Sequence, residues 1–242
     1  MSVHKIDFEL PESVYPDEAR AMVARLLDGQ QADLVSTLMN YQARTGDPQV
    51  GFPRVQFGRY RRGFSMLGFA EGQQILADAA PIIHNALSNH YSVVIPVSTK
   101  TYSVQAEWRP YRLEYSIPRV VVQKKDRQKA WMNDRATGKP YLESLLVRSL
   151  RRQAEVVGVE LPSAIDVAFL GADRDYGAKR KAEGGSLSAM GLINARFAVN
   201  LKLTGIWAIG YLLSKGHGHL DANMSLAGVP EDAEEINHAL SE

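Results

Sequence analysis

The stretch Ala195–Leu220, ARFAVNLKLTGIWAIGYLLSKGHGHL, decides what the second half of the chain is expected to form. Its first part is apolar and rich in β-branched and aromatic residues, which predicts a buried strand. The loop Gly210–His219 follows. Gly216 and Gly218 free the backbone for close approach and let successive N–H groups point the same way, while Lys215 adds a positive charge. The pattern predicts an anion-binding loop, and a plain glycine-rich hairpin is the alternative.

Length and composition indicate a globular protein. The chain has 242 residues, of which 45% are hydrophobic and 23% charged, so it can bury one large core or two small ones. It has no cysteine, which excludes disulfides and thiolate metal sites. There is no basic-then-apolar leader, and Lys202 interrupts the longest apolar run. We therefore expect a cytoplasmic protein without a membrane partner.

Charge is segregated along the chain although its net value is only +1. Four arginines and no acid lie between Arg54 and Arg62, and nine basic residues against three acids lie between Lys124 and Arg152. Acids collect near the ends, in Asp7–Asp33 and Glu231–Glu242. This segregation of basic residues favours a nucleic-acid partner, whereas the net charge taken alone argues against one.

The first hundred residues predict the order β-α-β-β-α-β of a ferredoxin-like domain. The segments with strand patterns are Val3–Leu10, Arg54–Tyr60, Gly63–Phe69 and Val93–Val97. The helical segments are one beginning at Glu18, a second turn or helix over Asp33–Arg44, and Gln73–Leu87.

The second half also predicts α+β structure. Strands are expected at Tyr111–Gln123, Ile165–Leu170 and Leu192–Leu203, with a helix at Tyr141–Val157 and a charged loop at Ala172–Gly185. We therefore expect an α+β chain of two ferredoxin-like halves. Their expected bounds are residues 1–108 and 109–242, with a basic, arginine-rich helical insertion at about 124–158 and a glycine-rich loop at 210–219.

The helix Tyr141–Val157 has two different faces. Leucines at 142, 145, 146 and 150 fall on one side, and Ser144, Arg148, Arg151 and Arg152 fall on the other. Only Glu155 is an acid placed to neutralise this row. Arginine binds phosphate bidentately, so an unpaired row suits an RNA stem, while a plain solvated face is the alternative.

Other chemistries find little support in the sequence. Of the six histidines, only His217 and His219 lie close together, which is weak as a metal motif, so we predict no metal site. The sequence contains no GxSxG nucleophile motif of a serine hydrolase, no P-loop and no dinucleotide-binding motif. We expect no small-molecule cofactor.

The chain resembles the RAMP superfamily of CRISPR-associated proteins, and within it the endoribonucleases that cut CRISPR repeat RNA. Local matches to the type I-F branch are Pro110–Arg112, Gly51–Pro53 and Tyr211–Gly216. The long loop Ala172–Gly185 and the tail after Asp221 differ from that branch and indicate a type IV relative.

The resemblance implies metal-independent cleavage of precursor RNA within the repeat hairpin, as part of antiviral defence. In such reactions the ribose 2′-OH attacks the scissile phosphate, and the enzyme stays bound to the mature crRNA with other effector subunits. The family's usual histidine near the end of the first helical region has no counterpart in Thr37–Arg44. The catalytic candidates are instead Tyr41, Arg44, Ser186, Ser188 and Tyr211. Tyrosine is a poor base near neutral pH and arginine stays protonated, so we expect positioning and charge stabilisation to dominate.

The candidate RNA-binding residues combine the arginine helix, the strand before it and the glycine-rich loop. They are Arg112, Arg119, Lys139, Arg148, Arg151, Arg152, Ser214, Lys215, Gly216 and His217. Arg112 resembles the position that contacts a base near the cut, with a strand-edge arginine as the alternative. Two alternatives to the enzyme remain: a RAMP-type subunit that binds RNA without cutting, and an RNA-binding protein outside CRISPR systems.

Overall fold

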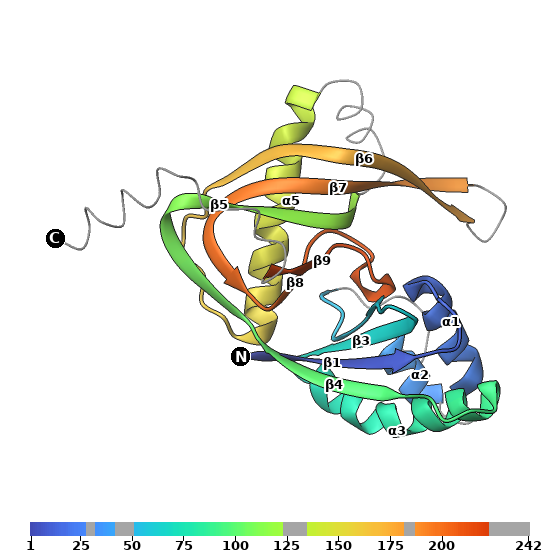
Figure 1. Cartoon of the computed structure of the whole chain (residues 1–242). Coiled ribbons are helices and arrows are strands. Elements are labelled where there is room, and N and C mark those ends of the chain that lie inside the picture. Colours follow the sequence, from blue (N-terminus) through green and yellow to red (C-terminus); the bar gives the residue numbers. More distant parts are fainter. Residues whose placement is uncertain (28–31, 42–50, 123–134, 182–186, 223–242) are drawn as a thin grey trace. The chain divides into compact units, whose positions relative to one another are not determined.

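The computed structural model describes residues 1–27, 32–41, 51–122, 135–181 and 187–222, with side chains except those of 135–137 and 173–192. These residues form two compact units (Figure 1). The first comprises Met1–Ser103 and Leu212–Gly216, and the second comprises Val104–Tyr211 and the residues from His217 onward. The short segment Leu212–Gly216 thus belongs to the first unit although it is distant from Met1–Ser103 in sequence.

The first unit is a ferredoxin-like fold. Its elements are β1 (Ser2–Glu9), α1 (Pro16–Leu27), α2 (Ala32–Leu38), β2 (Val55–Arg59), β3 (Gly63–Phe69), α3 (Gly72–Tyr91) and β4 (Val97–Ser103). The sheet is antiparallel with the order β2-β3-β1-β4, and α1 and α3 pack against it. In the core beneath these helices, the Phe64 ring stacks on Phe8 and packs at a tilt against Phe57. The predicted β-α-β-β-α-β order is confirmed.

The strand expected at Val93–Val97 is wrong in position, because β4 begins only at Val97. Ser92 has a left-handed backbone that ends α3, and Pro96 lacks the N–H that a ladder needs. Val93 and Val94 therefore lie in an exposed connection.

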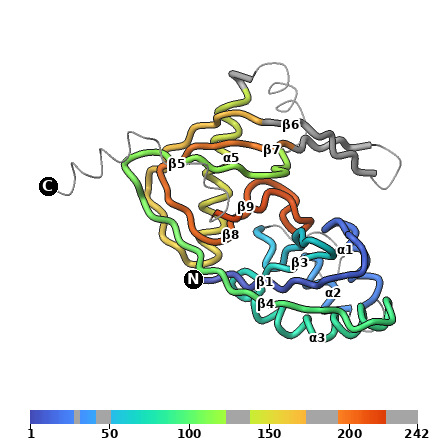
Figure 2. The backbone as a smooth tube through the Cα atoms, in the orientation of Figure 1, coloured from blue at the N-terminus to red at the C-terminus, as the bar shows by residue number. Residues whose placement is uncertain are grey.

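The second unit begins with the same element order. It contains β5 (Gln105–Val122), α5 (Arg135–Val157), β6 (Val167–Lys181) and β7 (Leu187–Thr204), followed by the short strands β8 (Ile206–Ala208) and β9 (His219–Asp221). The three long strands form an antiparallel sheet of order β5-β7-β6, and β8 pairs with β9. Figure 2 traces the chain from β7 through β8 and the glycine-rich loop into β9. The predicted α+β class is confirmed.

The charged loop expected at Ala172–Gly185 is wrong over most of its length. Residues up to Lys181 belong to β6 and pair with the start of β7, as in the register Lys181↔Leu187. The charged composition of this segment hid the strand, because its pairing partner lies outside any local sequence window. Residues 182–186 lie outside the described part of the chain.

None of the described helices is long and apolar enough to cross a membrane.

Candidate nucleic-acid interface

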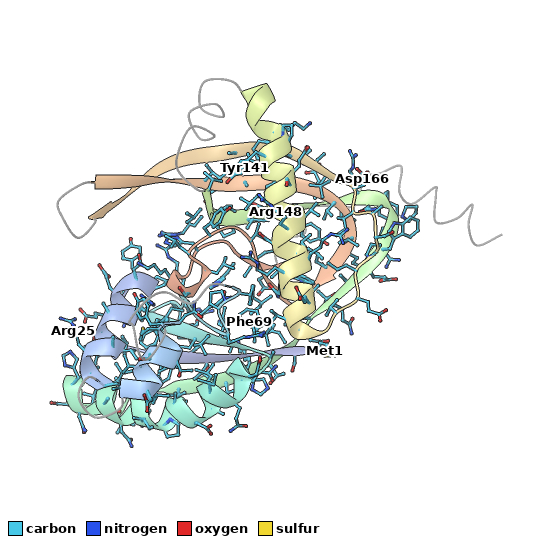
Figure 3. All side chains as sticks on the ribbon, turned by 180° about the vertical axis from the view of Figure 1, so that it is seen from behind. Met1, Arg25, Phe69, Tyr141, Arg148 and Asp166 are labelled. Atoms are coloured by element: carbon cyan, nitrogen blue, oxygen red, sulfur yellow. The ribbon has the colours of Figure 1, made fainter. Side chains whose placement is uncertain are left out.

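Helix α5 presents the expected arginine face. Arg148, Arg151 and Arg152 are exposed, while Leu142, Leu145, Leu146 and Leu150 on the other side are buried. Arg148 Nε donates a hydrogen bond to the Ser144 carbonyl at 3.2 Å, and Arg151 donates to the Ser163 carbonyl. The first contact stays within the helix, where Figure 3 labels Arg148, and the second ties Arg151 to the segment that follows the helix. The predicted division of the helix into an apolar and a basic face is confirmed.

The arginine face, defined as Arg148, Arg151 and Arg152, makes no ion pair with any described acid. Glu143, the acid nearest its start, is engaged elsewhere: its Oε1 lies 3.9 Å from Lys139 Nζ and accepts the Phe169 N–H at 2.8 Å. The positive charge of this face is therefore available to an external anion.

The buried side of α5 holds the base of the glycine-rich loop. Gln153 is fully buried; its Nε2 donates to the Ile206 carbonyl and its Oε1 accepts the Ala208 N–H, both at 2.7 Å. The Ser149 hydroxyl accepts the Gly210 N–H at 3.1 Å. These polar residues were not among the sequence candidates, since a buried amide within an apolar stripe carries no local signal.

The glycine-rich loop differs from the expected anion cradle. Its N–H groups at Lys215, Gly216 and Gly218 donate to the carbonyls of Leu212, Leu213 and Arg119. The expectation that N–H groups around Gly216 hold phosphate is therefore not met. Its glycines serve packing instead.

Two of these glycines have backbones that a side chain would not tolerate. Gly216 has φ +78°, and an added Cβ would lie 2.5 Å from Pro16 Cβ. Gly218 has φ +64°, and its Cβ would overlap the Ile209 carbonyl. Among the other loop candidates, Ser214 and Lys215 are half-buried and His217 is buried. Ser214 to Gly216 lie in the first unit and His217 in the second.

Arg112 of β5 is held by an acid that lies just before β6. Its Nε and Nη2 donate to the two Asp166 carboxylate oxygens at 2.7 and 2.6 Å, in a bidentate pair with both side chains exposed. The hydrogen bond to Asp166 raises the pKa of Arg112, and the same bond lowers the pKa of Asp166. A nucleic acid that uses Arg112 must displace this carboxylate.

Arg119 lies at a bend of β5 with a positive φ of 55°. Its N–H donates to the Asn194 side chain at 2.9 Å, and its carbonyl accepts the Gly218 N–H. This position thus ties β5 to β7 and to the start of β9.

Tyr41 lies in the first unit with a cation beside it. The Arg20 guanidinium stands 5.2 Å from the ring centroid of Tyr41 and donates to the Met39 carbonyl at 2.5 Å. Arg20 was not among the sequence candidates, because α1 and Tyr41 are brought together only by the fold.

Of the remaining catalytic candidates, the structure describes some only in part and others not at all. Tyr211 is half-buried in the second unit, and its N–H donates to the Val121 carbonyl at 3.1 Å. Ser188 pairs with Arg180 in the β6–β7 ladder, and its side chain lies outside the described part. Arg44 and Ser186 lie outside the described residues. In the described part of the chain, no three histidine, aspartate or glutamate side chains cluster as metal ligands.

A family model described as "Type IV CRISPR-associated endonuclease Csf5" matches residues 1–224. The chain belongs to this family. It is therefore an endoribonuclease of crRNA processing, as the sequence predicted, and the family does not favour the non-catalytic alternative. No curated protein matches the chain.

Solved structures share the fold of this Csf5 family member. A Csf5 structure, described as a type IV Cas6 crRNA endonuclease, superposes with a TM-score of 0.71 at 16% identity, covering 91% of this chain and 99% of that one. Two Cas6b structures give TM-scores of 0.63 and 0.58 at 15% and 13% identity, each covering 91% of this chain and 99% of its own. The predicted type IV family is thus confirmed, and the fold is shared with the Csf5 and Cas6b structures.

Proposed function

We propose that this endoribonuclease cuts CRISPR precursor RNA within the repeat hairpin by attack of a ribose 2′-OH, without a metal ion, and keeps the product as part of an effector complex. The observation that carries the proposal is the arginine face of α5. Its three exposed arginines have no ion-paired acid among the described residues, and arginine forks match phosphate oxygens.

In this proposal the hairpin stem lies along the arginine face. Gln153 and Ser149 fix the opposite side of the same helix to β8 and Gly210, so the arginines project from a rigid element. Arg119, Lys139, Ser214, Lys215, Gly216 and His217 remain further candidate contacts. For Gly216 the contact would not be its N–H group, which is already hydrogen-bonded.

For the chemical step, we propose that positioning and charge stabilisation replace a histidine base. Arg20 supplies a positive charge over the ring of Tyr41, whose hydroxyl could orient the ribose. Arg44, Tyr211, Ser186 and Ser188 remain candidates for orienting the 2′-OH or the phosphate. The arginines would favour the charge that develops on the phosphorane, with no proton exchange of their own.

The arginine face can be tested by the salt dependence of hairpin binding. Replacing Arg148 and Arg152 by alanine should weaken binding evenly across stem sequences and reduce the slope of log K against log salt by about one unit for each phosphate that is no longer neutralised. Arg109→Ala is the matched control, because Arg109 is paired with Glu107 at 2.7 Å. Equal weakening in the control and the double variant would refute the assignment of the stem to α5.

A further inference from the structure

The end of the β2–β3 hairpin carries a second basic surface, which the proposed stem site does not use. Arg59 ends β2, and Arg61 and Arg62 lie in the turn before β3; all three are exposed. None of them makes an ion pair with a described acid, whereas Arg54 from the same basic run pairs with Glu71 at 3.3 Å.

Two tyrosines stand beside cations at this hairpin end. The Arg59 guanidinium lies 4.9 Å from the Tyr15 ring centroid, and Tyr15 is 54% exposed. Lys5 Nζ lies 5.6 Å from the ring centroid of the half-buried Tyr60. Since Arg59 and Tyr60 are consecutive in an extended segment, these pairs occupy opposite faces of the hairpin.

The acids near this surface already have partners, apart from the exposed Glu9 and Asp17. Asp7 is buried and binds Lys5 Nζ at 2.9 Å and the Ser65 hydroxyl at 2.6 Å. Glu18 accepts the Tyr15 N–H at 3.1 Å, which fixes Tyr15 at the start of α1.

Aromatic rings beside cations are a recurring chemistry of single-stranded nucleic-acid binding. Unpaired bases stack on aromatic rings while arginine and lysine neutralise the backbone. A duplex stem cannot use such rings, because its bases are already stacked on one another. This hairpin end therefore suits a different part of the RNA from the stem.

We infer that the β2–β3 hairpin end binds the single-stranded RNA that flanks the repeat hairpin. Bases stack on Tyr15 and Tyr60, and phosphates contact Arg59, Arg61 and Arg62. The inference rests on the proposed function, since the flank belongs to the same RNA as the stem.

The experiment compares the affinities of three RNAs for the full chain: the hairpin alone, the hairpin with a single-stranded flank of about six nucleotides, and the same RNA with an abasic flank. The flank should tighten wild-type binding about tenfold, and the abasic flank should give only part of that increase. The variants are Arg61→Ala/Arg62→Ala and Tyr15→Ala. Both should lose most of the flank's effect and bind the hairpin alone as wild type does, which also reports that they are folded.

Arg25→Ala is the matched control, because Arg25 is likewise exposed in the first unit, on α1, and has no ion pair with a described acid. It should keep the whole effect of the flank. A flank that adds no affinity, or an increase that survives both variants, would overturn the inference while leaving the stem site intact. Failure of the wild-type protein to bind even the hairpin alone would instead refute the proposed function.

Discussion

At the scale of single residues, the Arg112–Asp166 pair controls access to a candidate RNA contact. An exposed bidentate pair is worth up to about 1 kcal/mol, so a ligand that needs Arg112 loses about that much in displacing the carboxylate. The pair joins residues that are 54 positions apart in sequence, so the pattern around Arg112 does not show it.

Asp166→Asn should therefore tighten hairpin binding about two- to fivefold, because it removes the competing negative charge. Arg112→Ala should weaken binding, and the double variant should bind like Arg112→Ala alone. Fluorescence anisotropy with labelled hairpin measures all three. Glu107→Gln, which frees Arg109 in the same way, should leave affinity unchanged. If Asp166→Asn binds as wild type does while Arg112→Ala is weaker, Asp166 does not compete with RNA.

Gly216 makes a second residue-scale prediction, about stability. Gly216→Ala should lower the free energy of unfolding by about 1–3 kcal/mol, because its φ of +78° and the approach of Pro16 Cβ to 2.5 Å both oppose a Cβ. Gly51→Ala is the control, since Gly51 also has a positive φ but no atom of the described residues within 4 Å of an added Cβ. Denaturant unfolding should show the larger decrease for Gly216→Ala. Equal decreases would show that backbone strain alone is responsible.

At the scale of elements, Gln153 joins α5, which carries the arginine face, to β8. Gln153→Leu keeps the volume but leaves the Ile206 carbonyl and the Ala208 N–H unpaired, which should destabilise the unit by about 2–4 kcal/mol. Hydrogen exchange should quicken at Ala208 and Ile209 and stay unchanged in β1. Uniform quickening throughout the chain would contradict a local role for Gln153.

Most elements could be predicted from the sequence because their signals are local. The alternation in β1 and the helical period of α1 placed these elements within a few residues, and the expected helix Tyr141–Val157 ends where α5 ends but starts later than α5, which begins at Arg135. The extension of β6 to Lys181 and the late start of β4 depend on cross-strand partners and on a helix cap, which no single segment displays.

At the scale of the whole molecule, the sequence indicated the family and the basic helix but not which residues meet. Arg20 beside Tyr41, Asp166 beside Arg112, and Leu212–Gly216 within the first unit arise only when distant segments pack. The loop glycines were expected to bind an anion, yet the close approaches of Gly216 and Gly218 are to the protein's own atoms. Sequence shows that a glycine is needed but not what approaches it.

The net charge of +1 conceals an uneven distribution of paired and unpaired cations over the described part of the molecule. The arginine face of α5 and the β2–β3 hairpin end carry exposed cations without ion-paired acids among the described residues, while Arg54, Arg109 and Arg112 are paired with acids. Affinity for RNA therefore depends on where charge is left uncompensated and not on its sum.

The central claim is tested most directly by cleavage of a labelled repeat hairpin in EDTA, beside the same hairpin with one 2′-deoxy substitution at the cut. We predict that the all-ribose hairpin is cut and that the substituted hairpin is bound but left intact, since the attacking oxygen is missing. Cleavage of both RNAs, or cleavage that returns only when a divalent metal is restored, would contradict the proposed mechanism.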